Sequence, residues 1–564
     1  MDGGVSSNSG STKHDEVDVC IVGSGAGGAP LALELGRAGF KTVVLEKGPH
    51  YQATDFVHDE ILNSRRNFFM PLPWDEPHLF RSTASKPYSR TNDGWTANCV
   101  GGGTVHMSGF FYRLKPMDFE LKKLLGNVPG ANVVDWPISY AEFSPWYDKA
   151  EEELGVSGNA VPHKFLEPRK KNYPLPPLAT HAIAGEVDKA IKSLGWTSLP
   201  TARGIISQPY KGRTGCQYCV LCGSYGCEHG AKSSTGASLI PQALETKKVE
   251  VRACSMAYEI TVDKAGLAKS VLYFDSEGRT HEQPAKIIVA SCTSIESARL
   301  LLNSKSSRFP NGLSNDNGQV GKNLVFSSFG QSRATFRISK RKAQWPWLDD
   351  VSPFVNRSLQ DFYAMPDDKF GFVKGGTLGF MLAHPNVIYA AVQLAKKGKE
   401  GIFGKALKDK LREYKDSRIL EFETYGEFLA TDGTYVQADS KVTDKYGLPV
   451  AAITITRHPT DLKMTKFLVE RGEEVLQAMN PESLERVGVA GETKILQGGT
   501  CRFGKDPATS VLDTDCRSHS VKNLYVVDGS FMPTSGGVPI TLTIAANSFR
   551  VADKLVKRLK TGKI

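Results

Sequence analysis

The feature that most constrains the fold is a glycine-rich turn near the amino terminus. An apolar run of strand length, VDVCIV at 17–22, precedes it, and a segment with helical spacing, LALELGRAGF at 31–40, follows it. The turn has the spacing GxGxxG, with glycines at Gly23, Gly25 and Gly28. The first glycine permits a tight turn, the second lets the backbone approach a pyrophosphate, and the third lets helix and strand pack closely. The pattern predicts a dinucleotide-binding βαβ unit.

A second apolar run, TVVLE at 42–46, supports this reading because it ends in an acidic residue. Glu46 stands about twenty residues beyond the turn, where a carboxylate can accept hydrogen bonds from both ribose hydroxyls. The same charge argues against a 2′-phosphate and therefore against NADP. A lone GxGxxG is weak evidence, but here strand, glycines, helix, strand and acid come in order. We therefore predict an α/β chain with a Rossmann-type domain.

Two further segments favour FAD over NAD. Near the carboxy terminus a strand ends in Asp528, and a glycine-rich turn then leads to a helix that starts near Thr541. An aspartate in that place can hold the ribityl hydroxyls of a flavin, while the amino end of the helix faces its pyrimidine carbonyls. A second glycine-rich loop contains Gly102 and Gly103 and ends in His106.

Composition excludes several other classes of protein. A chain of 564 residues with 40% hydrophobic residues can bury a full core, and its length suggests two to four structural units. Lys and Arg exceed Asp and Glu by 70 to 60, but they form no long basic run, so we expect no nucleic-acid partner. No apolar stretch approaches the roughly 18 residues of a membrane span.

The first fifteen residues are polar and lack the apolar core of a signal peptide or a twin arginine. We expect residues 1–15 to form a disordered tail. The protein would then be either cytoplasmic or periplasmic, in the latter case by export together with a partner subunit.

Four of the ten cysteines lie within twelve residues at the spacing CxxCxxCxxxxC: Cys216, Cys219, Cys222 and Cys227. Thiolates two residues apart can converge on one metal centre, and three close ligands followed by a fourth favour an iron-sulfur cluster. Structural zinc, which usually takes two separated pairs, and plain thiols or disulfides are the alternatives.

Together these segments resemble the glucose-methanol-choline (GMC) oxidoreductase family. The resemblance implies a FAD-binding domain built from discontinuous segments, 16–130, 205–330 and 490–564, with the cysteine-rich segment at 213–235. It implies that 131–204 and 331–489 form an α+β substrate-binding domain and its connections.

The cysteine segment is similar to that of the membrane-associated gluconate, fructose and glucose dehydrogenases of this family, in which a [3Fe-4S] cluster lies beside the flavin. The fourth cysteine leaves [4Fe-4S] open. This resemblance implies a small partner subunit and a cytochrome-type electron acceptor. A flavin accepts two electrons and a cluster one, so such a pair would serve a dehydrogenase rather than an oxidase.

The chain departs from the family pattern at the two catalytic positions. A histidine that acts as base is expected where Leu496 stands, and a histidine or asparagine that orients the alcohol is expected at Pro539. Neither residue can accept a proton. Substitute candidates are His384, His458, Gln497 and Glu427, with Tyr425 as a further option. Gln497 can only form hydrogen bonds, so we prefer a histidine, and His384 above His458.

The same departures resemble bacterial glucoside 3-dehydrogenases. They imply oxidation of a secondary alcohol of a sugar or glycoside, most often at C3, to a ketone. The alternatives are a flavin enzyme acting on a substrate other than a sugar and a noncatalytic electron-transfer subunit. A comparable GGxxxH loop attaches FAD covalently in some pyranose-oxidising relatives, so His106 is a candidate for such a bond.

Overall fold

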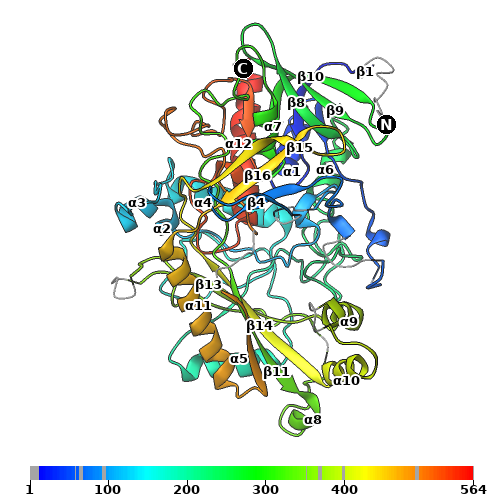
Figure 1. Cartoon of the computed structure of the whole chain (residues 1–564), viewed down its shortest axis with the longest axis vertical. Coiled ribbons are helices and arrows are strands. Elements are labelled where there is room, and N and C mark those ends of the chain that lie inside the picture. The colour runs from blue at the N-terminus through cyan, green and yellow to red at the C-terminus, as the bar shows by residue number, and fades with distance from the viewer. Residues whose placement is uncertain are drawn as a thin grey trace.

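The protein is described here from a computed structural model, which describes residues 12–57, 59–62, 68–91, 94, 97–350, 352–365, 371–396, 401–489 and 495–562. In Figure 1 the upper part of the molecule contains the first and the last segments of the chain together with one sheet. The lower part contains another sheet with its helices. Residues 1–11 of the expected tail lie outside the described residues. Residues 12–14 are ordered instead, because Thr12 and Lys13 pair with a strand and His14 stacks on Tyr273.

In the described part of the chain, eight strands form the first sheet. Six run in the order β7 (Val249–Arg252), β3 (Thr42–Leu45), β2 (Val17–Val22), β10 (Thr280–Ala290), β9 (Ala268–Phe274) and β8 (Met256–Val262). The other two, β1 (Thr12–Lys13) and β18 (Leu524–Val526), pair with β10.

Strand β10 holds the two ends of the chain together. Its second half pairs in parallel with β2 and with β18, so strands more than 500 residues apart flank one central strand. Ile287 to Ala290 of this half are almost completely buried, as expected for a parallel strand covered on both faces. The predicted Rossmann-type domain made of discontinuous segments is confirmed.

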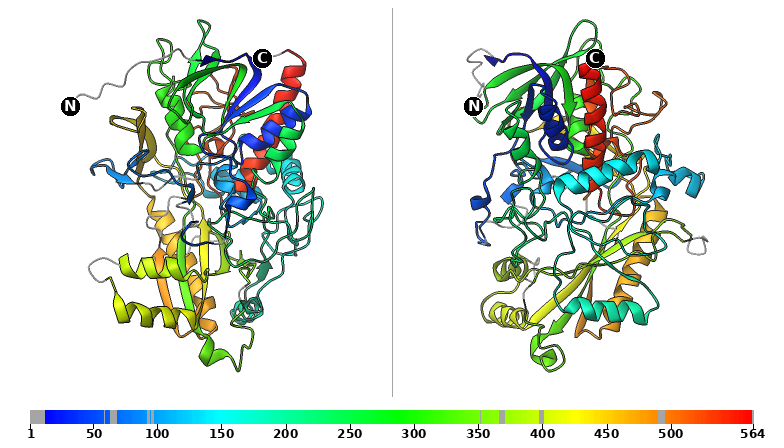
Figure 2. Two further views of the ribbon diagram at one scale, coloured as in Figure 1. Left: turned by 90° about the vertical axis from the view of Figure 1, so that its right-hand side faces the viewer. Right: turned by 180° about the vertical axis from the view of Figure 1, so that it is seen from behind.

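Several helices pack on this sheet and along its edge. Helix α1 (Gly28–Arg37) packs between α6 (Leu239–Glu245) and α12 (Thr541–Lys560), and α4 (Tyr140–Leu154) packs on α12. Figure 2 shows α12 running along the sheet beside α1. Helix α4 thus contacts the FAD-binding part, although its residues were assigned to the substrate-binding part.

The second sheet contains six strands among the described residues. Their order is β17 (Ser483–Val489), β11 (Gly330–Arg337), β14 (Ser417–Gly426), β13 (Gly376–Leu382), β12 (Arg357–Leu359) and β6 (Ser198–Pro200). Helix α11 (Pro459–Ala478) covers one face together with α5 (Ile183–Ser193), whereas α9 (Val387–Lys396) and α10 (Gly404–Lys415) lie on the other side in Figure 1.

Alternation along β14 divides its residues between these two sides. Leu420, Phe422 and Thr424 are fully buried, and the first two belong to the apolar core that includes residues of α11. Successive side chains of a strand point to opposite faces, so Glu421, Glu423 and Tyr425 face away from α11.

A third sheet joins segments from opposite halves of the chain. Strands β15 (Thr434–Thr443) and β16 (Pro449–Ile455) continue into β4 (His78–Arg81) and β5 (Ser89–Thr91), and α7 (Ser294–Asn303) packs on β15. The remaining short helices are α2 (Pro116–Phe119), α3 (Leu121–Leu125), α8 (Ile338–Arg341), η1 (Ala53–Asp55), η3 (Gly102–Thr104) and η5 (Gly529–Phe531). None of the helices in the described ranges has the length and apolar character needed to cross a bilayer.

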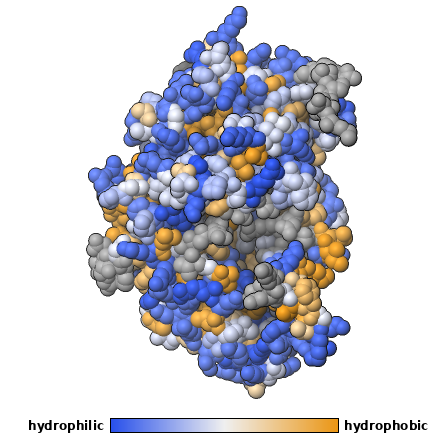
Figure 3. Space-filling model, in the orientation of Figure 1, coloured by the Kyte–Doolittle hydropathy of each residue, from blue (hydrophilic) through white to orange (hydrophobic). Residues whose placement is uncertain are grey.

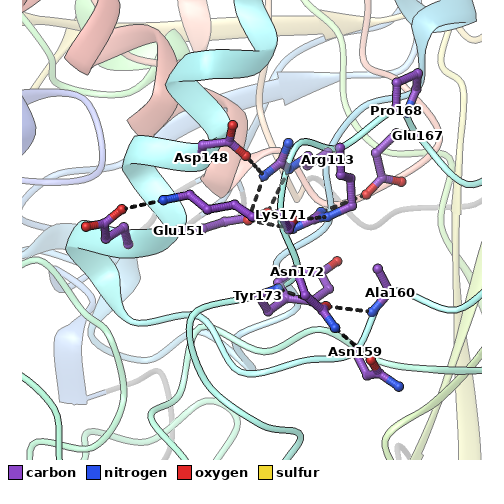
Figure 4. A network of polar contacts seen from close by, with 12 residues as sticks. Arg113, Asp148, Glu151, Asn159, Ala160, Glu167, Pro168, Lys171, Asn172 and Tyr173 are labelled. Carbon is purple, nitrogen blue, oxygen red and sulfur yellow. Dashed lines mark hydrogen bonds and ion pairs between the residues drawn. The ribbon is translucent and has the colours of Figure 1, made fainter.

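A buried ion network fixes the segment that follows the second glycine-rich loop. Arg113 lies between Asp148 and Glu151 of α4, as Figure 4 shows, with Nε 2.8 Å from Glu151 Oε1 and Nη2 2.6 Å from Asp148 Oδ1. Arg169 donates a further bond of 2.6 Å to Glu151 Oε2. Removing one partner of such a buried pair typically costs about 3–5 kcal/mol. The network therefore anchors the chain from Phe110 to Lys115 against α4.

Candidate active site

One large cavity lies between the first two sheets. Its volume is about 980 Å³, which is at the upper end for ligand pockets. The glycine-rich turn at 23–27 and the loop at 102–109 form one wall, and residues of β11, β13 and β14 form the opposite wall. The cavity can therefore hold a long ligand along the first sheet and a smaller one against the second.

The glycines of the first turn have the geometry that the sequence predicted. Gly23 has a φ of 101°, and a Cβ on Gly28 would stand 1.9 Å from the Gly23 carbonyl oxygen. Gly25 lines the cavity, and the nearest atom to a Cβ built on it is the Gly101 oxygen at 3.9 Å. The first and third glycines are thus needed by the protein itself, whereas the second leaves open space for a ligand.

Glu46 follows β3 and lines the cavity beside this turn. Its Oε2 accepts bonds from the amide and hydroxyl of Ser24 at 3.1 and 2.7 Å, and its Oε1 accepts one from the Gly48 amide at 3.0 Å. Burial raises the pKa of the carboxyl group, against the effect of these bonds. Each oxygen keeps lone-pair capacity for a ribose hydroxyl.

Asp528 and the start of α12 approach the cavity from the carboxy-terminal segment. Asp528 accepts bonds from the Ser530 amide at 2.8 Å and from Ser297 Oγ at 2.5 Å, and burial raises the pKa of its carboxyl group. Pro539, Ile540 and Thr541 line the cavity at the amino end of α12, where free amides favour electronegative groups.

Two buried hydroxyl groups on this wall indicate whether a cofactor would fit there. Ser291 Oγ and Ser294 Oγ are buried and have no hydrogen-bond partner within the described part of the chain, and both residues line the cavity. A buried hydroxyl without a partner is unfavourable, so a polar ligand would satisfy both. Together with the open space at Gly25, they fit a dinucleotide cofactor.

The opposite wall is polar and was largely missed by sequence reasoning. Glu421, Glu423 and Tyr425 of β14 line it, Arg333 Nε donates a bond of 2.7 Å to Glu421, and Tyr425 donates one of 2.5 Å to Glu423. The alternation in LEFETYGE at 420–427 was the available signal, since it places polar residues on one face of a strand.

Arg203 adds a buried cation to this wall. Its guanidinium lies 3.8 Å from the centre of the Phe110 ring, and it donates bonds to Ser108 O at 2.7 Å and Asn356 Oδ1 at 2.8 Å. Burial lowers the pKa of this guanidinium. No sequence pattern marked Arg203 because its neighbours come from distant segments.

Comparison with known proteins identifies the family. GMC oxidoreductase models match residues 181–327 and 431–548, and a FAD binding domain model matches residues 16–65. The chain is 30% identical over 560 residues to 2-methyl-1,2-propanediol dehydrogenase of Mycolicibacterium austroafricanum, covering 97% of this chain and 96% of that protein. The chain belongs to the GMC oxidoreductase family.

Other relatives of this GMC oxidoreductase include two proteins named for sugar substrates. Paromamine 6′-oxidase of Streptomyces fradiae is 30% identical over 555 residues, with 96% of this chain and 92% of that protein covered. The fructose dehydrogenase large subunit of Gluconobacter japonicus is 25% identical over 562 residues, with 97% and 98% covered. The crystal structure of pyridoxine 4-oxidase from Mesorbium loti has the same fold, with a TM-score of 0.62, 16% identity and coverage of 96% and 99%. This GMC oxidoreductase binds FAD and acts on alcohols.

The structure separates the candidates for a substitute base. Leu496 and Pro539 line the cavity, and Leu496 has a φ of 59°, a left-handed conformation that costs an L-residue roughly 1–2 kcal/mol. Gln497 also lines the cavity, but its side chain is engaged by the main chain at Gly94 and Ile295. It therefore holds the wall in place.

Of the two histidines predicted as substitute bases, His384 lies in the cavity wall. Its Nε2 lies 2.7 Å from the Gly223 carbonyl oxygen, and its ring centre lies 5.7 Å from that of Tyr225. Because a carbonyl oxygen can only accept, Nε2 carries a hydrogen and Nδ1 is the proton-accepting atom of the neutral ring.

The other two candidates lie outside the cavity lining. His458 caps α11, where its Nδ1 accepts a bond from Thr460 N at 3.2 Å and its Nε2 lies 3.0 Å from Pro129 O. Glu427 is buried, and its Oε1 accepts bonds from Ser535 N at 3.0 Å, from Ser535 Oγ at 2.9 Å and from Gly536 N at 3.3 Å. Burial raises the pKa of the Glu427 carboxyl group. Its role is to hold the loop before Pro539.

His106, the candidate for covalent attachment, lines the cavity at the end of the second glycine-rich loop, with its ring centre 5.6 Å from that of Phe69. Gly102 and Gly103 line the cavity next to it, and the Cα of Gly25 is 3.4 Å from a Cβ built on Gly102. The two glycine-rich segments thus form one continuous wall.

The predicted iron-sulfur cluster has no support in the structure. The four cysteines border one small cavity of about 20 Å³, which is room for about one water molecule and not for a cluster. Across the described ranges, no group of three or more His, Cys, Asp or Glu side chains could hold a metal ion. None of the four forms a disulfide, and Cys222 lines both this small cavity and the large one. The spacing brings the thiols into one region, but the local packing does not form a metal centre.

Proposed function

We propose that this GMC oxidoreductase is a dehydrogenase that oxidises a secondary alcohol of a sugar or glycoside to a ketone, with C3 as the first position to test. The observation that carries the proposal is the continuity of the cavity. Its glycine-rich wall fits the dinucleotide, and its other wall carries Glu421, Glu423 and Arg203. Carboxylates can accept hydrogen bonds from several hydroxyl groups, and a guanidinium group can donate hydrogen bonds to several others.

Relatives named for propanediol, paromamine and fructose support a substrate rich in hydroxyl groups. The preference for C3 rests on Leu496 and Pro539, which resemble the residues of glucoside 3-dehydrogenases. Bound FAD would supply the acceptor for the two electrons of the alcohol.

The residues of this chain then have to bind the alcohol and remove its proton. We assign proton removal to His384, because it lines the cavity and an imidazole can take up a proton near neutral pH. Gln497, with its side chain bonded to the main chain, keeps the wall at Leu496 rigid. Glu421 and Glu423 orient the other hydroxyls of the substrate.

We propose that the electrons leave the flavin through a partner protein. One relative is named a large subunit, which supports a small partner subunit and a cytochrome-type acceptor for this chain as well. The arrangement of the four cysteines does not fit a cluster, and no step is assigned to one.

Anaerobic addition of sugars to the FAD-loaded protein tests the proposal. We expect bleaching of the flavin absorbance with a methyl glycoside, and at least about tenfold slower bleaching with its 3-deoxy analogue, which lacks the reacting hydroxyl. Equal rates with both would exclude C3. No bleaching with any sugar or polyol would favour a noncatalytic electron-transfer subunit or a non-sugar substrate.

A further inference from the structure

Helix α9 exposes an apolar surface to solvent. No residue of this ten-residue helix, VIYAAVQLAK, is buried, although its only charged side chain is the terminal Lys396. Val387, Ile388 and Val392 are 44%, 44% and 39% exposed, and their spacing places them along one stripe of the helix. The helix lies at the right-hand flank in Figure 1, where the surface in Figure 3 shows hydrophobic colour.

The other side of the same helix borders the active-site cavity. Tyr389, Gln393 and Leu394 line it, so α9 is a thin wall between the cavity and the solvent. An ordinary surface helix would bury its apolar stripe against the core. In α9 the apolar stripe faces outward.

Neighbouring segments extend the exposed apolar surface. Ile61 and Leu62 are 72% and 65% exposed, and the preceding Glu60 accepts a bond of 2.9 Å from the Tyr389 amide at the start of α9. Phe403, directly before α10, is 68% exposed. Such clustered exposure is uncommon on a soluble monomer and indicates a contact surface.

Helix α10 packs beside α9 and is strongly basic. It carries four lysines and one arginine against one aspartate and one glutamate, and none of its residues is buried. Lys405 and Arg412 share Asp409, and Lys410 pairs with Glu413, so the acidic groups only partly offset the positive charge. Lys396 adds a further cation at the end of α9.

We propose that the α9–α10 pair docks on the surface of an anionic lipid bilayer. Exposed aliphatic and aromatic side chains flanked by lysines are what an interfacial helix uses, since the apolar groups enter the headgroup boundary and the cations bind acidic lipids. Complementary charge selects anionic lipid as the occupant. This goes beyond the proposed function, and it would place the wall of the cavity formed by Tyr389 and Leu394 next to the membrane.

Flotation of the FAD-loaded full chain with lipid vesicles tests the proposal. We expect the protein to float with vesicles that contain about one-third phosphatidylglycerol in phosphatidylcholine, and at least about tenfold less with pure phosphatidylcholine. Raising the salt to about 0.5 M should release much of it, because surface attraction is screened.

Matched substitutions separate this surface from general charge effects. Val392→Glu should lower the floated fraction at least about fivefold, whereas Leu267→Glu, at a 38% exposed position in the turn between β8 and β9, should leave it unchanged. Flavin absorbance checks that both variants are folded and loaded. Absence of flotation with anionic vesicles, or an equal effect of the two substitutions, would overturn the proposal. In the first case an acidic protein surface would be the better partner.

Discussion

The glycine-rich segments give one cavity wall an exposed main chain, whereas the opposite wall is built from side chains. The first depends on two short glycine runs, at 23–28 and 101–103, each of which is compact in sequence. The second collects Arg203, Glu421 and His384 from strands and loops far apart in the chain. Each glycine run is therefore encoded by a short stretch of sequence, while the opposite wall depends on how the second sheet is assembled.

The largest effect is expected from filling the open space beside Gly25 in the first wall. Gly25→Val should lower FAD affinity by about 10³-fold while leaving the fold intact, because its side chain would occupy the cofactor volume and contact little else. FAD titration of the apoprotein and thermal unfolding measure the two effects.

Two further variants serve as controls for the glycine wall. Gly28→Ala should lower both the FAD affinity and the unfolding temperature, because its Cβ would clash with the Gly23 carbonyl oxygen. Gly185→Val, where no atom lies within 4 Å of a built Cβ, should retain FAD. Loss of stability in Gly25→Val equal to that in Gly28→Ala would contradict the assignment.

The next largest effect concerns the base on the second wall. His384→Ala should slow substrate reduction of the flavin at least about 10²-fold with FAD still bound, since a positioned base typically contributes that much. Stopped-flow absorbance measures the rate.

His458→Ala is the comparison for the base, because His458 caps α11 outside the cavity lining and its loss should cost only about 1 kcal/mol of stability. A normal reduction rate in His384→Ala would move the search to Glu423 and its partner Tyr425.

A smaller effect is expected from the carboxylates of β14 that line the cavity. Glu421→Gln should raise KM for a sugar about tenfold with kcat little changed, because a hydrogen bond to a charged group contributes about 1.5–3 kcal/mol. Steady-state kinetics with an artificial acceptor give both constants. Glu277→Gln, at an exposed turn, is the matched control. A lower kcat with unchanged KM would mean that Glu421 acts on the reacting hydroxyl.

The smallest effect is expected at the cysteine segment. Cys222→Ser should change the rate of flavin reduction by less than about twofold, since electron exit follows substrate oxidation. Iron and acid-labile sulfide are measured in both proteins. Equally low iron and sulfide contents in the wild type and the variant would agree with the packing of the thiols. Iron that is present in the wild type and lost in the variant would instead support the cluster that the spacing predicted.

The fold was largely predictable because its signals are local. Strand, glycine turn, helix and second strand follow one another in sequence, and β2, α1 and β3 confirm the three predicted elements. The position of Asp528 in the cavity was also predictable, because a strand and a helix flank it in sequence. By contrast, His458 and Glu427 were chosen by residue type and by their place in the expected substrate-binding domain, and neither lines the cavity.

By itself, the sequence determined the dinucleotide wall, because only glycine tolerates the φ of Gly23 and the close approach at Gly28. Which polar residues line the opposite wall depends instead on the packing of the second sheet. Glu421 and Glu423 face the cavity because Phe422 between them is drawn into the core under α11. The tertiary structure also decided the state of the four cysteines, whose spacing permits a metal centre but whose side chains close around a space too small for one.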